Sequence, residues 1–253
     1  FHTELWPKVD FDITFEARRA IDAPKFPIDG FTVHVALEQG TLRLAPLDVA
    51  IAGGRYHGDF VLAPQGPGAH LQVKGNFSRL NFGRLLPRGG PIAPSDALID
   101  GTFAIDGRGR SFREVLAGGS GELRLVMGAG EMSNLLLELV GLDAFESLKF
   151  LLGGDKEVKV RCAVAALPLR AGRIEAQAVV FDTADTNVVV TGSADLAEER
   201  LDFTLHPAPK DWSLVSLRAP LHLRGSFARP QIEPDASRIA SRGIAAILLG
   251  LAN

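Results

Sequence analysis

The sequence predicts a mainly β fold: a long antiparallel, strongly twisted sheet that forms a curved trough or an open sandwich, with a few short helices and a C-terminal helix. Three observations support this prediction. Apolar and polar residues alternate with a period of two, clusters of glycine and proline separate the alternating segments, and helical patterns are few. Because one face of each strand is polar, the sheet is expected to be antiparallel and exposed to water on one side.

The alternation is clearest near the N-terminus. Residues 8–16 alternate strictly, and residues 31–38 repeat the pattern before a turn at Gly40 and a return strand at 41–44. Strand 158–166 also alternates, with valines and Cys162 on one face and basic residues on the other. Further strands are expected near 47–52, 54–63, 69–78, 97–107, 120–128, 156–167, 172–183, 187–196, 200–206 and 219–228.

Helical signals are limited to three places. Ser111 is the expected N-cap of a short helix over 111–116, with Glu114 three residues later as in a capping box. An almost wholly apolar helical insert is expected over about 131–152, and a terminal helix over about 235–251 begins at Asp235.

Composition excludes several functional classes. The chain has 253 residues, is 46% hydrophobic and carries a formal net charge of −3, so no bulk positive field favours nucleic acid. No run approaches the roughly 20 apolar residues of a membrane-spanning helix. The single cysteine, Cys162, permits no intrachain disulfide, and its alternating strand predicts a buried, inert thiol.

No motif for catalysis or cofactor binding is present. Gly107-Arg108-Gly109 lacks the third glycine of a dinucleotide loop, Gly118–Glu122 lacks the last glycine of a hydrolase elbow, and no two histidines have zinc-ligand spacing. We therefore expect no catalytic residue, no metal ligand, no cofactor and no enzymatic activity. A Gly-polar-Phe tripeptide begins at Gly58, Gly75, Gly101 and Gly225, and its irregular spacing favours ordinary strand patterning over a fixed-period repeat.

Eight segments occur in a fixed order between about Ser111 and Asn253: 119–125, 158–167, 180–183, 190–196, 199–203, 207–211, 221–227 and 229–232. This ordered set resembles the C-terminal region of the AsmA family, whereas residues 1–110 share only the family's general β patterning. The resemblance implies two parts, a β-rich groove segment over 1–110 and an AsmA-like C-terminal domain over 111–253. It also implies kinship with TamB-like and bridge-like lipid transporters, whose long sheets curve around an apolar interior.

The resemblance further implies a non-catalytic role in the Gram-negative envelope. We expect a periplasmic segment whose apolar β-groove binds or conducts phospholipids or similar lipids between the inner and outer membranes, supporting outer-membrane lipid homeostasis. The full-length protein is expected to be anchored in the inner membrane by an N-terminal helix that is absent here. The alternative is an interaction scaffold for outer-membrane protein assembly or targeting, with membrane or envelope-protein contacts through 131–152 or 235–251.

A lipid needs an apolar lane for its acyl chains, which a curved sheet with one apolar face can supply. The expected lining is Val9, Phe11, Ile13, Phe15, Phe31, Val33, Val35, Leu37, Leu42, Leu44, Val158, Val160, Val164, Leu201, Phe203 and Leu205. The same alternation is equally consistent with a sandwich whose two apolar faces close on each other.

Overall fold

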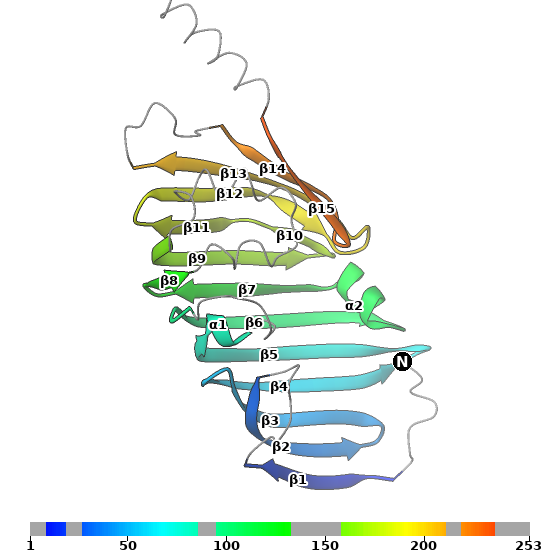
Figure 1. Ribbon diagram of the computed structural model, residues 1–253. Helices are drawn as coiled ribbons and strands as arrows, with labels where there is room; N and C mark the ends of the chain where they lie inside the picture. Colours follow the sequence, from blue (N-terminus) through cyan, green and yellow to red (C-terminus); the bar gives the residue numbers. More distant parts are fainter. Residues whose placement is uncertain (1–8, 19–26, 86–94, 133–157, 211–218, 236–253) are drawn as a thin grey trace, which may run out of the picture.

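The computed structural model describes residues 9–18, 27–85, 95–132, 158–210 and 219–235, and within these every strand belongs to a single antiparallel sheet of 15 strands. Figure 1 shows the strands stacked in order from β1 to β15 and rotating progressively, so the sheet is twisted. The mainly β prediction is confirmed. Because one sheet holds all the described strands, the closed sandwich is not the arrangement of this part of the chain.

The elements follow one another along the sheet. The strands are β1 (Phe11–Ala17), β2 (Ile28–Glu38), β3 (Thr41–Ile51), β4 (Gly54–Gln65), β5 (Gly68–Asn81), β6 (Leu98–Gly109), β7 (Ser120–Met127), β8 (Gly130–Met132), β9 (Val158–Arg170), β10 (Arg173–Glu175), β11 (Ala178–Thr183), β12 (Thr186–Asp195), β13 (Arg200–Pro209), β14 (Leu221–Ser226) and β15 (Arg229–Pro234). The two described helices are α1 (Phe82–Leu85) and α2 (Phe112–Gly118). The main path of pairing runs from β1 through β7 and β9 to β15, with β8 paired to β9, and β11 inserted between β9 and β12.

The helix predicted over 111–116 is confirmed as α2. Ser111 is its N-cap, and the Ser111 hydroxyl accepts a hydrogen bond from the Glu114 amide at 3.2 Å. The Glu114 carboxylate accepts the amide of Arg110 at 2.9 Å, which satisfies a second donor at the start of the helix and lowers the pKa of Glu114.

Two expected helices fall on residues that the structure does not describe. Of the insert over 131–152, only residues 131–132 are described, and these belong to β8. Of the terminal helix over 235–251, only Asp235 is described. The predicted division at residue 110 stays a prediction, while β6 pairs with β7 across it.

Candidate functional site

The first three strands place their apolar side chains on one face. In an antiparallel pair, residues directly opposite each other point to the same side of the sheet. Phe11, Ile13 and Phe15 lie opposite Leu37, Val35 and Val33. In turn, Leu37 and Val35 lie opposite Leu42 and Leu44. These predicted lining residues therefore share one side of the sheet, while their role as a lining stays a prediction.

The same register extends this face across all the remaining strands on the path of pairing. We call it the apolar face. Its large side chains beyond β3 are Tyr56, Phe60, Leu62, Leu71, Val73, Phe77, Leu80, Ile99, Phe103, Ile105, Leu123, Leu125, Met127, Val160, Leu167, Leu169, Ile174, Val179, Phe181, Val188, Val190, Leu201, Phe203, Leu205, Leu221, Leu223 and Ile232. Within the described strands this face carries no charged side chain, and its hydrogen-bonding side chains are Tyr56, Thr183 and Thr186.

Most predicted lining residues lie on the apolar face, but Val164 does not. Val164 lies opposite Val126 on β7 and Val180 on β11, which puts it on the other face, where it is 38% exposed. Val158 begins β9, and its side chain lies outside the described part. Val9 precedes β1 and is 67% exposed.

A β-bulge in β9 explains the error at Val164. The register shifts there, because Asp182 lies opposite Cys162 while the next residue, Thr183, lies opposite Val160. The extra residue reverses which side of the sheet the later side chains occupy. Cys162 is consequently exposed on the polar face, and the prediction of a buried thiol is wrong.

The middle of the apolar face, between β4 and β7, was missed as lining. These strands show the same alternation as the strands that were predicted to line the groove, so the signal was present in the sequence. Cross-strand pairing was needed to show that they join the two predicted groups into one surface. Leu62 and Leu71, which pack against Val115, are only 5% and 3% exposed.

Glycines beneath aromatic rings explain the Gly-polar-Phe tripeptide. Gly58 and Gly75 are paired on the apolar face, and the ring of Tyr56 lies over them. A Cβ on Gly75 would stand 2.5 Å from Tyr56 Cε2, and one on Gly101 would stand 2.5 Å from Phe77 Cζ. Glycine is needed here because it leaves room for a ring from the neighbouring strand. The fourth tripeptide differs, since its Phe227 follows β14 and is 42% exposed.

Two short helices cover opposite ends of the strands on the apolar face. Val115 of α2 is fully buried against Leu62 and Leu71, and Gly107 lies directly beneath the Val115 carbonyl. At the other end, Phe82 of α1 packs against a cluster that contains Met127. Between them the described residues supply no second layer over the apolar face.

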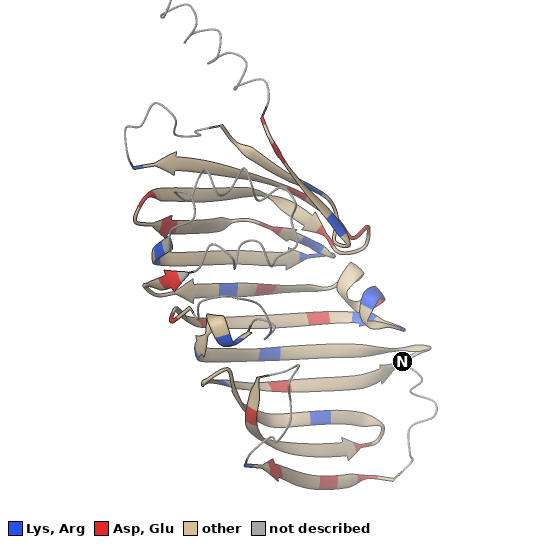
Figure 2. Ribbon diagram, in the orientation of Figure 1, with Lys and Arg blue, Asp and Glu red and all other residues tan. Residues whose placement is uncertain are grey.

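Residues of both charges are spread along the strands (Figure 2). The face opposite the apolar face, which we call the polar face, carries ion pairs between neighbouring strands. His57 Nδ1 lies 2.7 Å from Asp48 Oδ1, and the Lys74 ammonium pairs with Asp59 at 3.2 Å. The pKa of His34 is raised by two neighbours. The Asp12 carboxylate lies 2.7 Å from His34 Nε2, and the Ala45 carbonyl oxygen lies 3.1 Å from His34 Nδ1. Because these ion pairs are exposed, they keep this face of the sheet compatible with water but add little to its stability.

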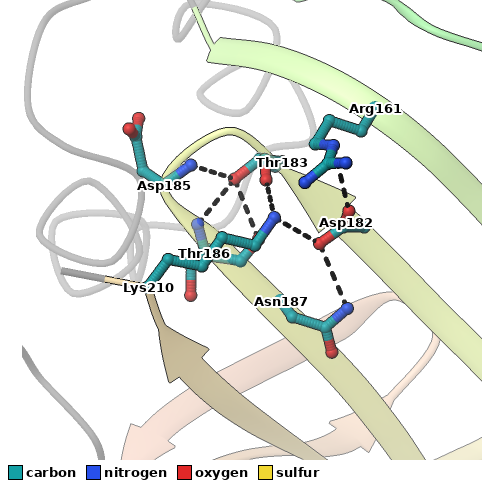
Figure 3. Close-up of polar contacts among 7 residues, drawn as sticks. All are labelled: Arg161, Asp182, Thr183, Asp185, Thr186, Asn187 and Lys210. Atoms are coloured by element: carbon teal, nitrogen blue, oxygen red, sulfur yellow. Dashed lines mark hydrogen bonds and ion pairs between the residues drawn. The ribbon is translucent and has the colours of Figure 1, made fainter.

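A polar cluster closes the turn between β11 and β12 (Figure 3). The buried Thr183 hydroxyl donates to the Thr186 carbonyl at 3.0 Å and accepts the Thr186 amide at 2.9 Å. Lys210, at the end of β13, donates to the Thr183 carbonyl and pairs with Asp182 at 2.7 Å. Hydrogen bonds from Lys210 and then Asn187 lower the pKa of Asp182. The cluster fixes a strand end and is structural.

Two hollows among the described residues are lined largely by side chains of the polar face. One of about 640 Å³ is lined mostly by polar-face side chains, among them Asp48, His57 and Asn76. Another of about 450 Å³ lies over β3 to β7 and includes Asp59 and Lys74, which already pair with each other. Both are open to solvent.

The polar face also carries a row of apolar side chains. Val126, Val164, Val180 and Val189 lie directly opposite one another on β7, β9, β11 and β12, and we call them the valine row. Three of them, Val126, Val164 and Val189, are 38–54% exposed. An exposed apolar strip of this kind on a water-facing surface is typical of a contact site.

The described residues contain no group of three or more His, Cys, Asp or Glu side chains arranged to hold a metal ion. Neither described helix has the length and hydropathy to cross a bilayer.

Comparison with known proteins identifies the chain's relatives. The AsmA family profile matches residues 1–179, which includes the region where the sequence alone showed only general β patterning. The AsmA family protein YhjG of Escherichia coli (strain K12) is 33% identical over 253 residues, which is 98% of this chain but 36% of YhjG. The chain thus spans about a third of that relative. No solved structure matches. The continuous one-sided sheet and the extent of the profile match agree, and the chain belongs to the AsmA family.

Proposed function

We propose that the apolar face is a lane for the acyl chains of lipids, along which phospholipids or similar lipids are bound or conducted between the inner and outer membranes. The observation that supports this is the unbroken apolar face from β1 to β15, without a charged side chain among the described strands. Family membership points to the same envelope-related role. No catalytic step is part of the proposal.

The energetics of the face suit acyl chains. Each buried CH₂ contributes roughly 0.8 kcal/mol, so a chain of a dozen methylenes binds an open apolar surface without any specific polar contact. The absence of charge along the lane matters equally, because a charged side chain would have to lose its hydration when a chain passed over it. The lane works only if it is continuous, and the strand register makes it so.

The test uses neighbouring residues of β7 that point to opposite faces. Leu125 lies on the apolar face between Gly101 and Ala165, and Val126 lies on the polar face. Leu125→Asp places a carboxylate in the lane, whereas Val126→Asp places one in water. We expect Leu125→Asp to reduce transfer of fluorescent phospholipid between donor and acceptor vesicles at least tenfold, with Val126→Asp close to wild type.

Circular dichroism and the elution volume of both variants check that the sheet persists. Equal transfer by the two aspartate variants, or no transfer and no bound lipid with the unaltered chain, contradicts the lane. Phe203→Asp, paired with Leu223 on β14, repeats the test on a distant strand and must give the same loss.

The valine row favours a second function, an interaction scaffold for outer-membrane protein assembly or targeting. A protein partner needs exposed apolar side chains on the water-facing side, and the valine row supplies them. Replacing Val126 and Val164 by threonine should abolish partner capture while leaving lipid transfer intact if this function holds. The contacts expected through 131–152 and 235–251 remain proposals, because those segments lie almost wholly outside the described residues.

The proposal includes a cellular location. We place the chain in the periplasm, with the full-length protein anchored in the inner membrane. Fractionation of cells that produce the full-length protein tests this, and recovery of the protein from the cytoplasm contradicts it.

A further inference from the structure

Tyr56 is exceptional on the apolar face. The other hydrogen-bonding side chains there are Thr183 and Thr186, which are fully buried at the turn between β11 and β12. Tyr56 instead lies within the lane, between Val49 of β3 and Phe77 of β5. It is the one polar group that a lipid on β1 to β7 of the described sheet would meet.

The ring of Tyr56 is fixed by its neighbours. It lies across Gly58 and Gly75, with the hydroxyl directly over Gly58. It also stacks on Phe103 of β6, with ring centroids 5.8 Å apart and an interplanar angle of 23°. The stacking on Phe103 and the cover over Gly75 are made largely by ring carbons, which phenylalanine would also supply. The hydroxyl itself packs over Gly58.

The hydroxyl has no protein partner among the described residues, where no hydrogen bond to Tyr56 is formed. Partial burial raises the pKa of Tyr56, so the group is a neutral donor at physiological pH. A half-buried hydroxyl without a partner is hydrated in the free protein. An acyl chain laid over it displaces that water, and the lost hydrogen bond then weakens binding unless the ligand provides an acceptor.

We propose that Tyr56 is a specificity-determining residue that donates a hydrogen bond to the ester carbonyl of an acyl lipid lying on the apolar face. The inference rests on the proposed lane and names the class of lipid, an ester-linked diacyl lipid. An ester carbonyl is the acceptor that lies directly next to an acyl chain, so one molecule can satisfy both the hydroxyl and the apolar floor.

Strand spacing fits this placement. An acyl chain of about 15 Å, half of a bilayer core, spans about three strands at about 4.8 Å each. A carbonyl at Tyr56 therefore leaves its chain on the floor formed by Phe77, Phe103 and Leu123 of the next three strands.

The experiment compares dioleoyl phosphatidylcholine with its diether analogue, which lacks both carbonyls but keeps the headgroup and chains. Binding to the purified chain is measured by native mass spectrometry and by competition with a fluorescent fatty acid. The unaltered chain should bind the ester lipid roughly three- to tenfold more tightly than the ether lipid, as expected for one hydrogen bond. Tyr56→Phe should bind both lipids equally, with its affinity for the ether lipid unchanged or improved.

Thr102→Val is the matched control, because it removes a hydroxyl from β6 on the polar face. It should leave the ester preference intact. A Tyr56→Phe variant that retains the preference, or unaltered protein that binds ester and ether lipids equally, overturns the role of Tyr56 but leaves the lane standing. Failure of both lipids to bind the unaltered protein overturns the lane itself, and this inference with it.

Discussion

The two faces of the sheet use the same strands but tolerate change differently. On the apolar face, glycines and large side chains are matched across strands, as where Gly58 and Gly75 underlie Tyr56. On the polar face, neighbouring side chains meet as exposed ion pairs such as Lys74 with Asp59. The difference indicates that side chains on the apolar face must fit one another in size, whereas side chains on the polar face need only stay hydrated. Substitutions on the two faces should therefore differ in effect.

The largest effect on stability is expected at Gly58. A Cβ there would stand 2.4 Å from the Lys74 carbonyl oxygen and 2.8 Å from the Gly75 Cα, both backbone atoms of β5 that cannot move independently. Gly58→Ala should thus lower the free energy of local opening of β4 and β5 by about 1–3 kcal/mol. Amide hydrogen exchange measures it.

Gly118→Ala is the control for that substitution, because no atom lies within 4 Å of the added Cβ. It should leave exchange of the α2 amides unchanged or slower, since alanine favours helix by up to about 1 kcal/mol over glycine. Equal exchange in the two variants would remove the contrast between matched and unmatched glycines.

The next effect concerns the cluster around Asp182. Its pKa is lowered in the folded protein, so the ionised carboxylate stabilises the fold at neutral pH, and this contribution is lost as the pH falls through the lowered value. The thermal midpoint of Asp182→Asn should lie below that of wild type above about pH 5 and converge with it in acid. Lys210→Met should behave similarly, and a pH-independent difference would refute the assignment.

A smaller, local effect is expected at His34. Because Asp12 and the Ala45 carbonyl raise its pKa, the protonated ring stabilises the fold below its ordinary pKa, and this contribution is lost as the pH rises through the raised value. Titration followed by NMR should place its midpoint above about 6.5. Asp12→Asn should bring the midpoint of His34 down, because it removes the carboxylate that favours the protonated ring.

The smallest effect is expected at Lys74. Its side chain is 75% exposed, so Lys74→Met should alter the free energy of unfolding by less than about 0.5 kcal/mol. The thermal midpoint measures the change. A clear destabilisation would mean that the polar face is specified as tightly as the apolar one.

Sequence reasoning recovered the strands and the sides of most side chains, since period-two alternation encodes both. It failed at Val164 and Cys162 because a bulge adds one residue without leaving a signal in the pattern of apolar residues. It also left trough and sandwich unresolved, because both bury the same alternating positions. Tyr56 was overlooked, since its importance comes from Gly75 and Phe103 on neighbouring strands.

The order of the strands has a consequence for how the chain folds. From β1 to β7 each strand pairs with the one before it in the chain, so each new pairing joins two consecutive strands. Such a ladder can nucleate at any hairpin and grow outward by adding one strand at a time, and it opens from its ends in the same stepwise manner. Loss of an end strand therefore leaves its neighbours paired.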